Sequence, residues 1–532
     1  MSVQVRPREA GAGTGVLGEI LNHAASQPSR PAAKDPVKDL TYRQLCEAAG
    51  TVGLRLAERG VREGDRVAVH VENSVDFVIA ALGSLWVGAT FVPLAVGDPE
   101  TRLQLILDDC DPALVIESAA DEHLPSLPDS LRRYESVGIS ELSEPSTRSL
   151  RDPLPEFSGR AAYAIYTSGT TGTPKGVLIS CEAFSTAVCA AASALRLGRD
   201  TKALCVSPFH FDGSYATLFS TLVAGGSTVM RPRDTLLFPR TFFETIANEE
   251  ITYTSFSPSY LQLLCSSGKL PVLASTRLEL VALGGEALSV ADVQALWAAA
   301  PGVRLFNRYG PTETTIAVTN FELTPDLIAG GHVPIGLPHS GTSFHIIDAR
   351  GKVVEGADVI GELYVGGNQL MLGYLGEPAL TAQVVRGNVI PGKTVYKTGD
   401  LVFRDEVGCY VYFDRADRVV KRNGVRISLV ELTQAVQSLF GISSAVCSAF
   451  DRSGRLGIVA FVVLEQSRSP LELRMAARER LPATMIPDRF EVVDALPLTA
   501  SNKVDEPSLL ERAGLCAAPR AGAVNSVPAG SH

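Results

Sequence analysis

One short stretch combines hydroxyls, glycines and a lysine in a pattern that suits phosphate binding. Residues 166–177 read Tyr-Thr-Ser-Gly-Thr-Thr-Gly-Thr-Pro-Lys-Gly-Val and follow the apolar run 161–165, which is typical of a buried strand. Glycines let a backbone close around an anion, hydroxyl and N–H groups then donate to phosphate oxygens, and the lysine adds positive charge. We therefore predict a phosphate loop at a strand end, where open α/β sheets bind ligands. A flexible turn is the alternative interpretation.

A lone acid, Asp212, stands among aromatic and small residues in the segment 207–214, which reads Ser-Pro-Phe-His-Phe-Asp-Gly-Ser. A buried carboxylate has to meet a cation or several hydrogen-bond donors. The local pattern by itself favours a helix cap, because Asp212 and Ser214 directly precede the apolar run 215–223. Binding of a positively charged substrate group is the functional alternative.

A third group of residues, Asn307-Arg-Tyr-Gly-Pro-Thr-Glu-Thr-Thr315, combines an aromatic ring, hydroxyls and an acid. It comes after the segment 280–289, an apolar strand that ends in Gly-Gly, where backbone can approach a flat ligand. An aromatic ring suits stacking on a purine, and a carboxylate suits Mg²⁺. The group is hard to explain as an ordinary turn.

The elements that must position these groups alternate between helix and strand. Residues 40–59 show a helical pattern, 65–70 alternate like a strand, 76–85 are apolar enough for a buried helix, and 85–94 pass through a glycine into a short strand. This alternation predicts α/β layers. A chain of 532 residues is long enough for more than one domain.

Taken in order, the motifs resemble those of the adenylate-forming superfamily, which includes acyl-CoA synthetases, luciferases and the adenylation domains of nonribosomal peptide synthetases. The agreement runs from about residue 40 to residue 505. Besides the segments above it includes Tyr396-Lys-Thr-Gly-Asp-Leu401 and Leu496-Pro-Leu-Thr-Ala-Ser-Asn-Lys-Val-Asp505. By itself, Thr-Gly-Asp would usually be a turn.

The resemblance implies an α/β adenylate-forming fold, with a large N-terminal domain of layered α/β subdomains and a small, mobile C-terminal α+β lid. We expect a disordered N-terminus over 1–14, an adenylation core over 15–414, a hinge over 415–418, a lid over 419–512 and a flexible tail over 513–532. The tail is mostly small and polar from residue 516 and lacks the Gly-Gly-x-Ser attachment motif of a carrier domain.

For the nucleotide, the resemblance implies catalytic roles for Lys503, Thr312 and Glu313, with Glu313 also holding Mg²⁺. In this scheme Tyr309 stacks on adenine, Asn307 bonds its exocyclic amine and Asp400 binds the ribose. The expected ATP and AMP contacts are Thr167, Ser168, Gly169, Thr170, Thr171, Gly172, Lys175, Gly285, Glu286, Asn307, Tyr309, Gly310, Asp400, Tyr412 and Arg415.

For the acyl substrate, Phe-Asp-x-Ser resembles the motif whose aspartate binds the amino group of an amino acid, so Asp212 points to an amino acid. The expected substrate contacts are Phe211, Asp212, Gly213, Ala216, Ser255, Ala282, Gly284, Arg308, Ile316 and Ala317. Most of these are small. Arg308 is the exception, and it either reads a second carboxylate or carbonyl of the substrate or pairs with an internal acid.

The implied reaction has two steps: a carboxylate attacks the α-phosphorus of ATP, and a thiol then displaces AMP. Between them the lid turns about Asp417 and presents the loop around Gly424 to a pantetheine arm. We expect a separate acyl carrier protein as acceptor, as in stand-alone ligases that load α- or β-amino acids for polyketide macrolactam assembly; coenzyme A is second. Asp414 and Asn502 replace glycines of the family pattern.

Composition excludes several other classes. The net charge of −10 gives no basic footprint for nucleic acid or an anionic membrane surface, and the nine cysteines are scattered without a Cys-x-x-Cys pair. Without a signal peptide pattern, we expect a cytoplasmic enzyme. The alternatives are an acyl- or aryl-CoA synthetase and a catalytically silent homologue, although the latter has no physical reason to keep Lys175, Glu313, Asp400 and Lys503.

Overall fold

The computed structural model describes residues 15–118, 127–144, 160–168, 174–416, 418–422, 425–439, 441–452, 455–465, 467–481, 485–499 and 503–518. Its first sheet has the strand order β18-β8-β7-β4-β3-β5-β6. The bounds of these strands are Arg66–His70 for β3, Thr90–Pro93 for β4, Leu114–Glu117 for β5, Ser136–Gly138 for β6, Ala161–Ser168 for β7, Pro174–Ser180 for β8 and Gly373–Tyr374 for β18.

The second sheet has the order β14-β13-β12-β11-β9-β10-β1-β2, and its inner strands run parallel. Its strands are β1 Pro31–Lys34, β2 Asp39–Thr41, β9 Lys202–Cys205, β10 Ser227–Met230, β11 Tyr253–Phe256, β12 Leu280–Gly284, β13 Arg304–Tyr309 and β14 Thr319–Glu322. Apolar residues on alternate positions of β12 face opposite sides, since Val281 and Leu283 join one core cluster and Leu280 and Ala282 another.

Helices fill the space between these sheets and cover their outer faces. The helices are α1 Gly15–Ser26, α2 Tyr42–Glu58, α3 Val75–Trp86, α4 Glu100–Cys110, α5 Ile139–Leu142, α6 Cys181–Leu195, α7 Tyr215–Val223, α8 Arg233–Leu236, α9 Pro239–Asn248, α10 Pro258–Ser266 and α11 Val290–Ala299. The α6 helix touches β7 and β8 of the first sheet as well as β14 of the second, while α7 touches β9 and β10. Helix α6 therefore contacts both sheets and helps to cover their apolar strands.

A third, antiparallel sheet follows, with the path β15-β21-β20-β17-β16 and with β19 paired to β20. Its elements are β15 Pro334–Gly336, β16 Thr342–Ile347, β17 Gly361–Gly367, α12 Pro378–Val384, β19 Val385–Ile390, β20 Lys393–Arg404 and β21 Tyr410–Arg415. The Thr-Gly-Asp of residues 398–400, which alone suggested a turn, lies inside β20, because its backbone pairs with β17 and β21.

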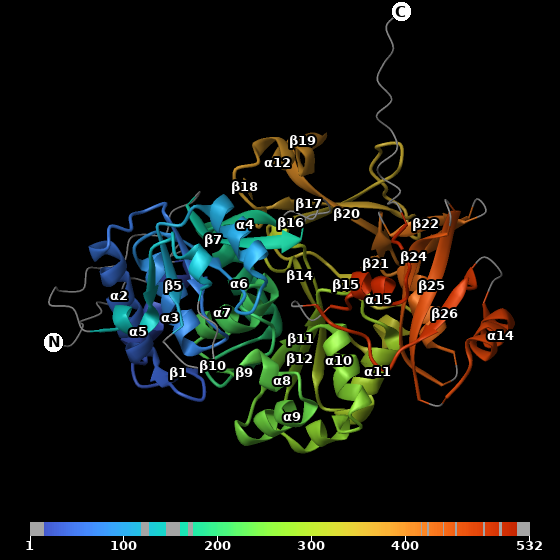
Figure 1. The fold of residues 1–532 in the computed structure, drawn as a ribbon, viewed down its shortest axis with the longest axis horizontal. Coiled ribbons are helices and arrows are strands. Elements are labelled where there is room, and N and C mark those ends of the chain that lie inside the picture. The colour runs from blue at the N-terminus through green and yellow to red at the C-terminus, as the bar shows by residue number, and fades with distance from the viewer. Residues whose placement is uncertain are drawn as a thin grey trace, which may run out of the picture.

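The C-terminal elements form a smaller unit, coloured orange to red in Figure 1, which packs around its own core. They are β22 Val419–Arg422, β23 Val425–Ser428, α13 Leu429–Gln437, β24 Ile442–Arg452, β25 Arg455–Leu464, α14 Pro470–Arg480, β26 Arg489–Val492 and α15 Glu506–Arg512. Beyond α15, Ala517 bridges Phe450 of β24. The expected large α/β part and small α+β part are both present; the domain boundaries stay predictions.

Short 3-10 turns link several of these elements at η1 Asp129–Leu131, η2 Asp212–Ser214, η3 Leu270–Ser275, η4 Thr312–Thr314 and η5 Pro325–Ile328. Two of them, η2 and η4, belong to the motifs singled out from the sequence. Over the part of the chain that the structure describes, we find no helix with the length and apolar character needed to cross a membrane.

Candidate active site

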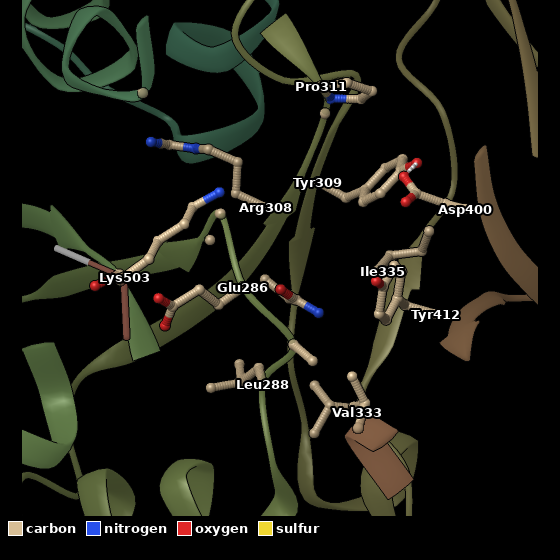
Figure 2. Close-up of a pocket in the computed structure, with 18 of the residues that line it drawn as sticks. Glu286, Leu288, Arg308, Tyr309, Pro311, Val333, Ile335, Asp400, Tyr412 and Lys503 are labelled. Atoms are coloured by element: carbon tan, nitrogen blue, oxygen red, sulfur yellow. Dashed lines mark hydrogen bonds between the residues drawn. The ribbon is translucent and has the colours of Figure 1, made fainter. Parts of the chain in front are cut away.

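A cavity of about 550 Å³ opens where the large part of the molecule meets the C-terminal unit. Its walls come from the ends of β12 and β13, the turns η2 and η4, strands β20 and β21 of the third sheet, and helix α13 with the Lys503 loop. Figure 2 shows Arg308 and Tyr309, neighbours on β13, pointing to opposite sides. This follows from the alternation of side chains along a strand and divides the cavity into two halves.

Most of the predicted site residues share this one cavity although they come from segments far apart in the sequence. Those in its lining are Phe211, Asp212, Gly213, Ser255, Gly284, Gly285, Glu286, Asn307, Arg308, Tyr309, Gly310, Thr312, Ile316, Asp400, Tyr412, Arg415 and Lys503. The half on the Tyr309 side contains residues expected to contact the nucleotide, and the half on the Arg308 side contains residues expected to contact the acyl substrate. We call them the nucleoside half and the acyl half after these predictions.

Six predicted residues lie outside the described part of the chain: Gly169, Thr170, Thr171 and Gly172 of the phosphate loop, the hinge residue Asp417, and Gly424. The two ends of the phosphate loop are described. Ser168 on β7 pairs with Pro174 on β8, and Thr167 pairs with Lys175. The loop therefore joins two antiparallel strands, which makes it shorter than the stretch 166–177 that we singled out.

The nucleoside half is built around Tyr309, Tyr412 and Asp400. The Tyr309 hydroxyl donates to Asp400 Oδ2 at 2.5 Å, and Arg415 Nη1 lies 3.2 Å from Asp400 Oδ1. Burial, together with the nearby Asp400 carboxylate, raises the pKa of Tyr309, so that hydroxyl stays protonated. The carboxylate expected to bind the ribose is thus held at the rim of an aromatic pocket by two donors.

Asn307 is oriented for the role expected of it. Its Nδ2 donates to the carbonyl of Pro334 at 2.8 Å, so the amide oxygen is left to accept a hydrogen bond from a ligand. Apolar side chains that the sequence did not single out, Leu288, Val333 and Ile335, complete this wall (Figure 2). No local motif marks them, because a flat apolar wall can be built from any aliphatic residues.

The acyl half contains Asp212, whose side chain is 3% exposed. Its oxygens accept from the Thr312 hydroxyl at 3.3 Å and from the N–H of Ile316 at 3.2 Å. Burial raises the pKa of Asp212 to about 7, against the lowering effect of these two donors. The helix-cap interpretation favoured by the local pattern is wrong, since Asp212 bonds to distant residues and makes no cap to α7.

The donor of Ile316 is presented by a strained turn. Thr315 and Ile316 have φ values of 59° and 67°, a left-handed conformation that is rare for β-branched residues. Gln369, which is 1% exposed, holds the turn: its Nε2 donates to the carbonyls of Thr315 at 3.3 Å and Ala317 at 2.8 Å. No local sequence pattern pointed to Gln369, which lies more than fifty residues from Thr315.

Lys503 reaches into the cavity from the C-terminal unit (Figure 2). Its Nζ lies 5.6 Å from the centre of the Phe211 ring, within the range of a cation–π contact. The same ammonium lowers the pKa values of Asp212 and Glu286, although burial raises both overall. The predicted catalytic lysine therefore stands between the two halves of the cavity.

Glu313 lies outside the cavity lining, next to the end of the phosphate loop. Its Oε1 accepts from the Tyr374 hydroxyl at 2.8 Å, and Lys175 Nζ lies 5.8 Å from the centre of the Tyr374 ring. Mg²⁺ is usually held by one or two carboxylates plus phosphate oxygens, so a single acid at this place fits the ion. Thr167 also stands outside the lining.

Arg308 is buried in the acyl half, at 6% exposed. Its guanidinium donates to Asn320, Ser255 and Tyr253, all of them neutral. The sequence left two roles open for Arg308, and among the described residues we observe no pairing of Arg308 with an internal acid. The small residues Ala216, Ala282 and Ala317 are buried and do not belong to the cavity lining, so their roles as substrate contacts stay predictions.

Comparison with known families and proteins gives a consistent picture. The family model of the AMP-binding enzymes matches residues 20–375, and that of the AMP-binding enzyme C-terminal domain matches residues 434–503. Tyrocidine synthase 3 from Brevibacillus parabrevis is 34% identical over 495 residues, which are 91% of this chain but 7% of that synthase.

Two solved structures share the fold. A holo four-domain nonribosomal peptide synthetase bound to AMP and glycine superposes with a TM-score of 0.81 at 25% identity, over 94% of this chain and 37% of the other. An anthranilate CoA ligase in complex with anthranoyl-AMP superposes with a TM-score of 0.82 at 22% identity, over 95% of this chain and 98% of the other. These likenesses confirm the expected fold.

Proposed function

The chain belongs to the AMP-binding enzymes of the adenylate-forming superfamily, and from that premise we propose that it activates an amino acid as its aminoacyl adenylate. In the proposed reaction ATP supplies the adenylyl group and pyrophosphate leaves. The aminoacyl group then passes to the phosphopantetheine thiol of an acyl carrier protein on a separate chain. We predict that this acyl carrier protein belongs to a polyketide assembly line that forms a macrolactam.

Asp212 is the observation that carries the amino-acid assignment. Its carboxyl group is buried in the acyl half, and both donors that it accepts from are neutral. An ionised carboxylate in such a place is compensated when a cation binds beside it. The ammonium group of an amino acid supplies that charge, whereas a fatty or aryl acid leaves it unpaired.

In the first step, a carboxylate oxygen of the amino acid forms a bond to the α-phosphorus and the bond to pyrophosphate breaks. Negative charge gathers between the two halves of the cavity, where the ammonium of Lys503 stands. Thr312, whose hydroxyl can turn from Asp212 to a phosphate oxygen, adds a donor. Mg²⁺ held by Glu313 would neutralise phosphate charge. Loss of one such charged contact typically slows a reaction by roughly a hundredfold or more.

In the second step, the thiolate sulfur attacks the carbonyl carbon of the adenylate and AMP leaves with the bonding electron pair. The lid movement about Asp417 and the thiol approach past Gly424 stay part of this proposal. Lys503 lies in the cavity in the described arrangement, as the first step requires. A second arrangement, with the lysine withdrawn, would serve the thiol.

The first experiment is ATP–pyrophosphate exchange with a panel of α-amino, β-amino, fatty and aryl acids. We expect exchange with an amino acid, and we expect Asp212→Ala to lower kcat/KM for that acid by at least about a hundredfold. Asp292→Ala is the matched control, because Asp292 is another buried acid that caps α11 and does not belong to the cavity lining. Exchange only with acids that lack an amine would contradict the proposal.

The acceptor is tested separately, with the purified carrier protein in its phosphopantetheine form and with coenzyme A. Transfer to the carrier at low micromolar concentration, and not to coenzyme A, is the expected result. Efficient transfer to coenzyme A together with indifference to Asp212→Ala would instead identify a CoA synthetase.

A further inference from the structure

Arg308 places a positive charge in the wall of the acyl half, and no acid among the described residues pairs with it. The side chain lines the cavity and is 6% exposed, so water screens it little. Taking a guanidinium out of water is costly unless an anion compensates it. An anionic group of the ligand is therefore a candidate to compensate the charge of Arg308.

The hydrogen bonds of Arg308 all go to uncharged groups. Nε donates to Asn320 Oδ1 at 2.7 Å, Nη1 to the Ser255 hydroxyl at 3.0 Å and Nη2 to the Tyr253 hydroxyl at 2.9 Å. Arginine has five N–H donors, so one remains on each of Nη1 and Nη2. Among the residues that the structure describes, no carboxylate lies within ion-pair distance of this guanidinium.

Another arginine on the same strand shows what an internal pair looks like here. Arg304 binds Glu322 of β14 through two contacts, Nε to Oε1 at 2.7 Å and Nη2 to Oε2 at 3.1 Å. At Arg308 the register of the two strands brings Asn320, a neutral amide, to the opposite position. The same pair of strands therefore gives Arg304, outside the cavity, an acidic partner and gives Arg308, in the cavity wall, a neutral one.

The surroundings of Arg308 fix it in place without neutralising it. Nδ2 of Asn320 and Nε2 of His339 lie 3.0 Å apart, which keeps the amide oxygen of Asn320 toward Arg308. Burial, with the positive charge of Arg308 as a smaller contribution, lowers the pKa of His339, and Gln369 bonds its other nitrogen. The layer behind the guanidinium is thus uncharged at neutral pH.

The neighbouring strand approaches Arg308 closely at a glycine. Gly284 of β12 pairs with Arg308, and a Cβ at this glycine would stand 2.6 Å from the Arg308 carbonyl oxygen and 3.0 Å from its Cβ. No larger residue fits there without a shift of the strands. Gly284 and Arg308 both line the cavity, and a side chain at residue 284 would disturb this part of its wall.

We propose that Arg308 binds a second carboxylate of the amino acid, so that the substrate class is the amino dicarboxylic acids. This deepens the proposed function and rests on it. One carboxylate of the substrate is activated, the ammonium lies at Asp212, and the remaining carboxylate accepts hydrogen bonds from the two Nη groups of Arg308. Such bidentate, charge-assisted contacts are among the strongest that proteins make.

The test is ATP–pyrophosphate exchange with aspartate and glutamate, each beside its neutral amide and a hydrocarbon amino acid of similar size. We expect the wild type to prefer a dicarboxylate over its neutral partner by about a hundredfold or more in kcat/KM. Arg308→Gln should remove most of that preference, mainly through the KM of the amino acid. Arg304→Gln, the matched control, should leave the preference unchanged.

A binding measurement guards against a variant that simply misfolds. Calorimetry with aspartyl and asparaginyl sulfamoyl-adenosine should show tighter binding of the aspartyl form to the wild type, and a loss of the difference in a folded Arg308→Gln protein. Equal exchange with neutral and acidic amino acids, or a preference that survives Arg308→Gln, would overturn the inference while leaving amino-acid activation standing. Exchange with succinate but with no amino acid would instead refute the proposed function.

Discussion

Asp212 joins two properties that usually oppose each other in one residue, burial and charge. Burial raises its pKa to about 7, so the group changes protonation near neutral pH. An ammonium substrate binds the ionised form. Ionisation of this one carboxyl group should therefore favour substrate binding and lower the stability of the unliganded fold.

We predict that kcat/KM for the amino acid rises with pH through about 7 and levels off above it. One pH unit below the pKa only about a tenth of Asp212 is ionised, so activity near pH 6 should be roughly tenfold below the plateau. The measurement is exchange kinetics from about pH 5.5 to 8.5 at saturating ATP. The KM for ATP is the internal control, and a profile that is flat through neutrality would contradict the prediction.

We also predict that Asp212→Asn stabilises the unliganded protein at alkaline pH. The pKa of Asp212 in the folded protein lies above its unfolded value of 3.8. The protonated carboxyl group therefore stabilises the fold fully below about pH 4, and this contribution to the free energy of unfolding is lost as pH rises through about 7. The amide never ionises, and it should raise the free energy of unfolding by a few kcal/mol near pH 8. Thermal unfolding at about pH 5 and pH 8 checks this, since the gain should shrink at the lower pH.

At this scale the sequence indicated which residue types belong near the site, but not which of them line the cavity and which are buried. It placed Asp212, Arg308 and Lys503 in one site, and the cavity contains all three. It also placed Ala216 and Ala282 there, and both are buried and do not belong to the cavity lining. Spacing along a motif reports which residues are neighbours, whereas depth depends on the direction of each side chain after packing.

At the scale of elements, the turn between η4 and β14 depends on Gln369, which precedes β18. Its side-chain amide satisfies two carbonyls of a turn with left-handed Thr315 and Ile316. Each such conformation costs about 1–3 kcal/mol and persists only where the surroundings enforce it. In return the N–H of Ile316 points at Asp212.

We predict that Gln369→Leu relaxes this turn and raises the KM of the amino acid by roughly tenfold, because Asp212 loses a fixed donor. The KM for ATP should change far less, since Asn307 and Tyr309 are held by other contacts. Thermal unfolding should show a loss of about 1–3 kcal/mol from the unpaired carbonyls. Equal changes in both KM values would show that the variant damages the whole site and that the turn has no special role.

The pairing of β13 with β14 illustrates what the sequence could not supply. Helix α2 and strands β3 and β7 were predicted close to their observed bounds, because hydrophobic periodicity is a local signal. The placement of Asn320 opposite Arg308 follows instead from an antiparallel register, which a shift of one residue would change. The partner of Arg308 was therefore beyond prediction.

At the scale of the molecule, Asp414 connects the large part of the chain to the C-terminal unit. This residue lies near the end of β21 and is fully buried. Its Oδ2 accepts from the Ser428 hydroxyl at 2.7 Å and from the N–H of Val430 at 3.2 Å, in the first turn of α13. A core carboxylate thus caps a lid helix, at a position where the family pattern has glycine.

This contact makes Asp414 a restraint on the lid movement that the resemblance implies. In the described arrangement Lys503 lies in the cavity, which suits adenylate formation. Rotation about residue 417 would separate Asp414 from α13 and break both bonds. Each bond of this kind contributes about 0.5–2 kcal/mol, enough to shift the balance between two lid positions severalfold.

We predict that Asp414→Ala slows adenylate formation about five- to tenfold and leaves transfer to the thiol unchanged or faster, because only the first arrangement is weakened. Single-turnover measurements of the two steps, with pre-formed adenylate for the second, separate the effects. Asp488→Ala is the control, since Asp488 accepts from Ile458 within the lid and spans no boundary. If both steps slow equally in Asp414→Ala, the carboxylate only stabilises the lid, and the lid's position on the core is set by other contacts.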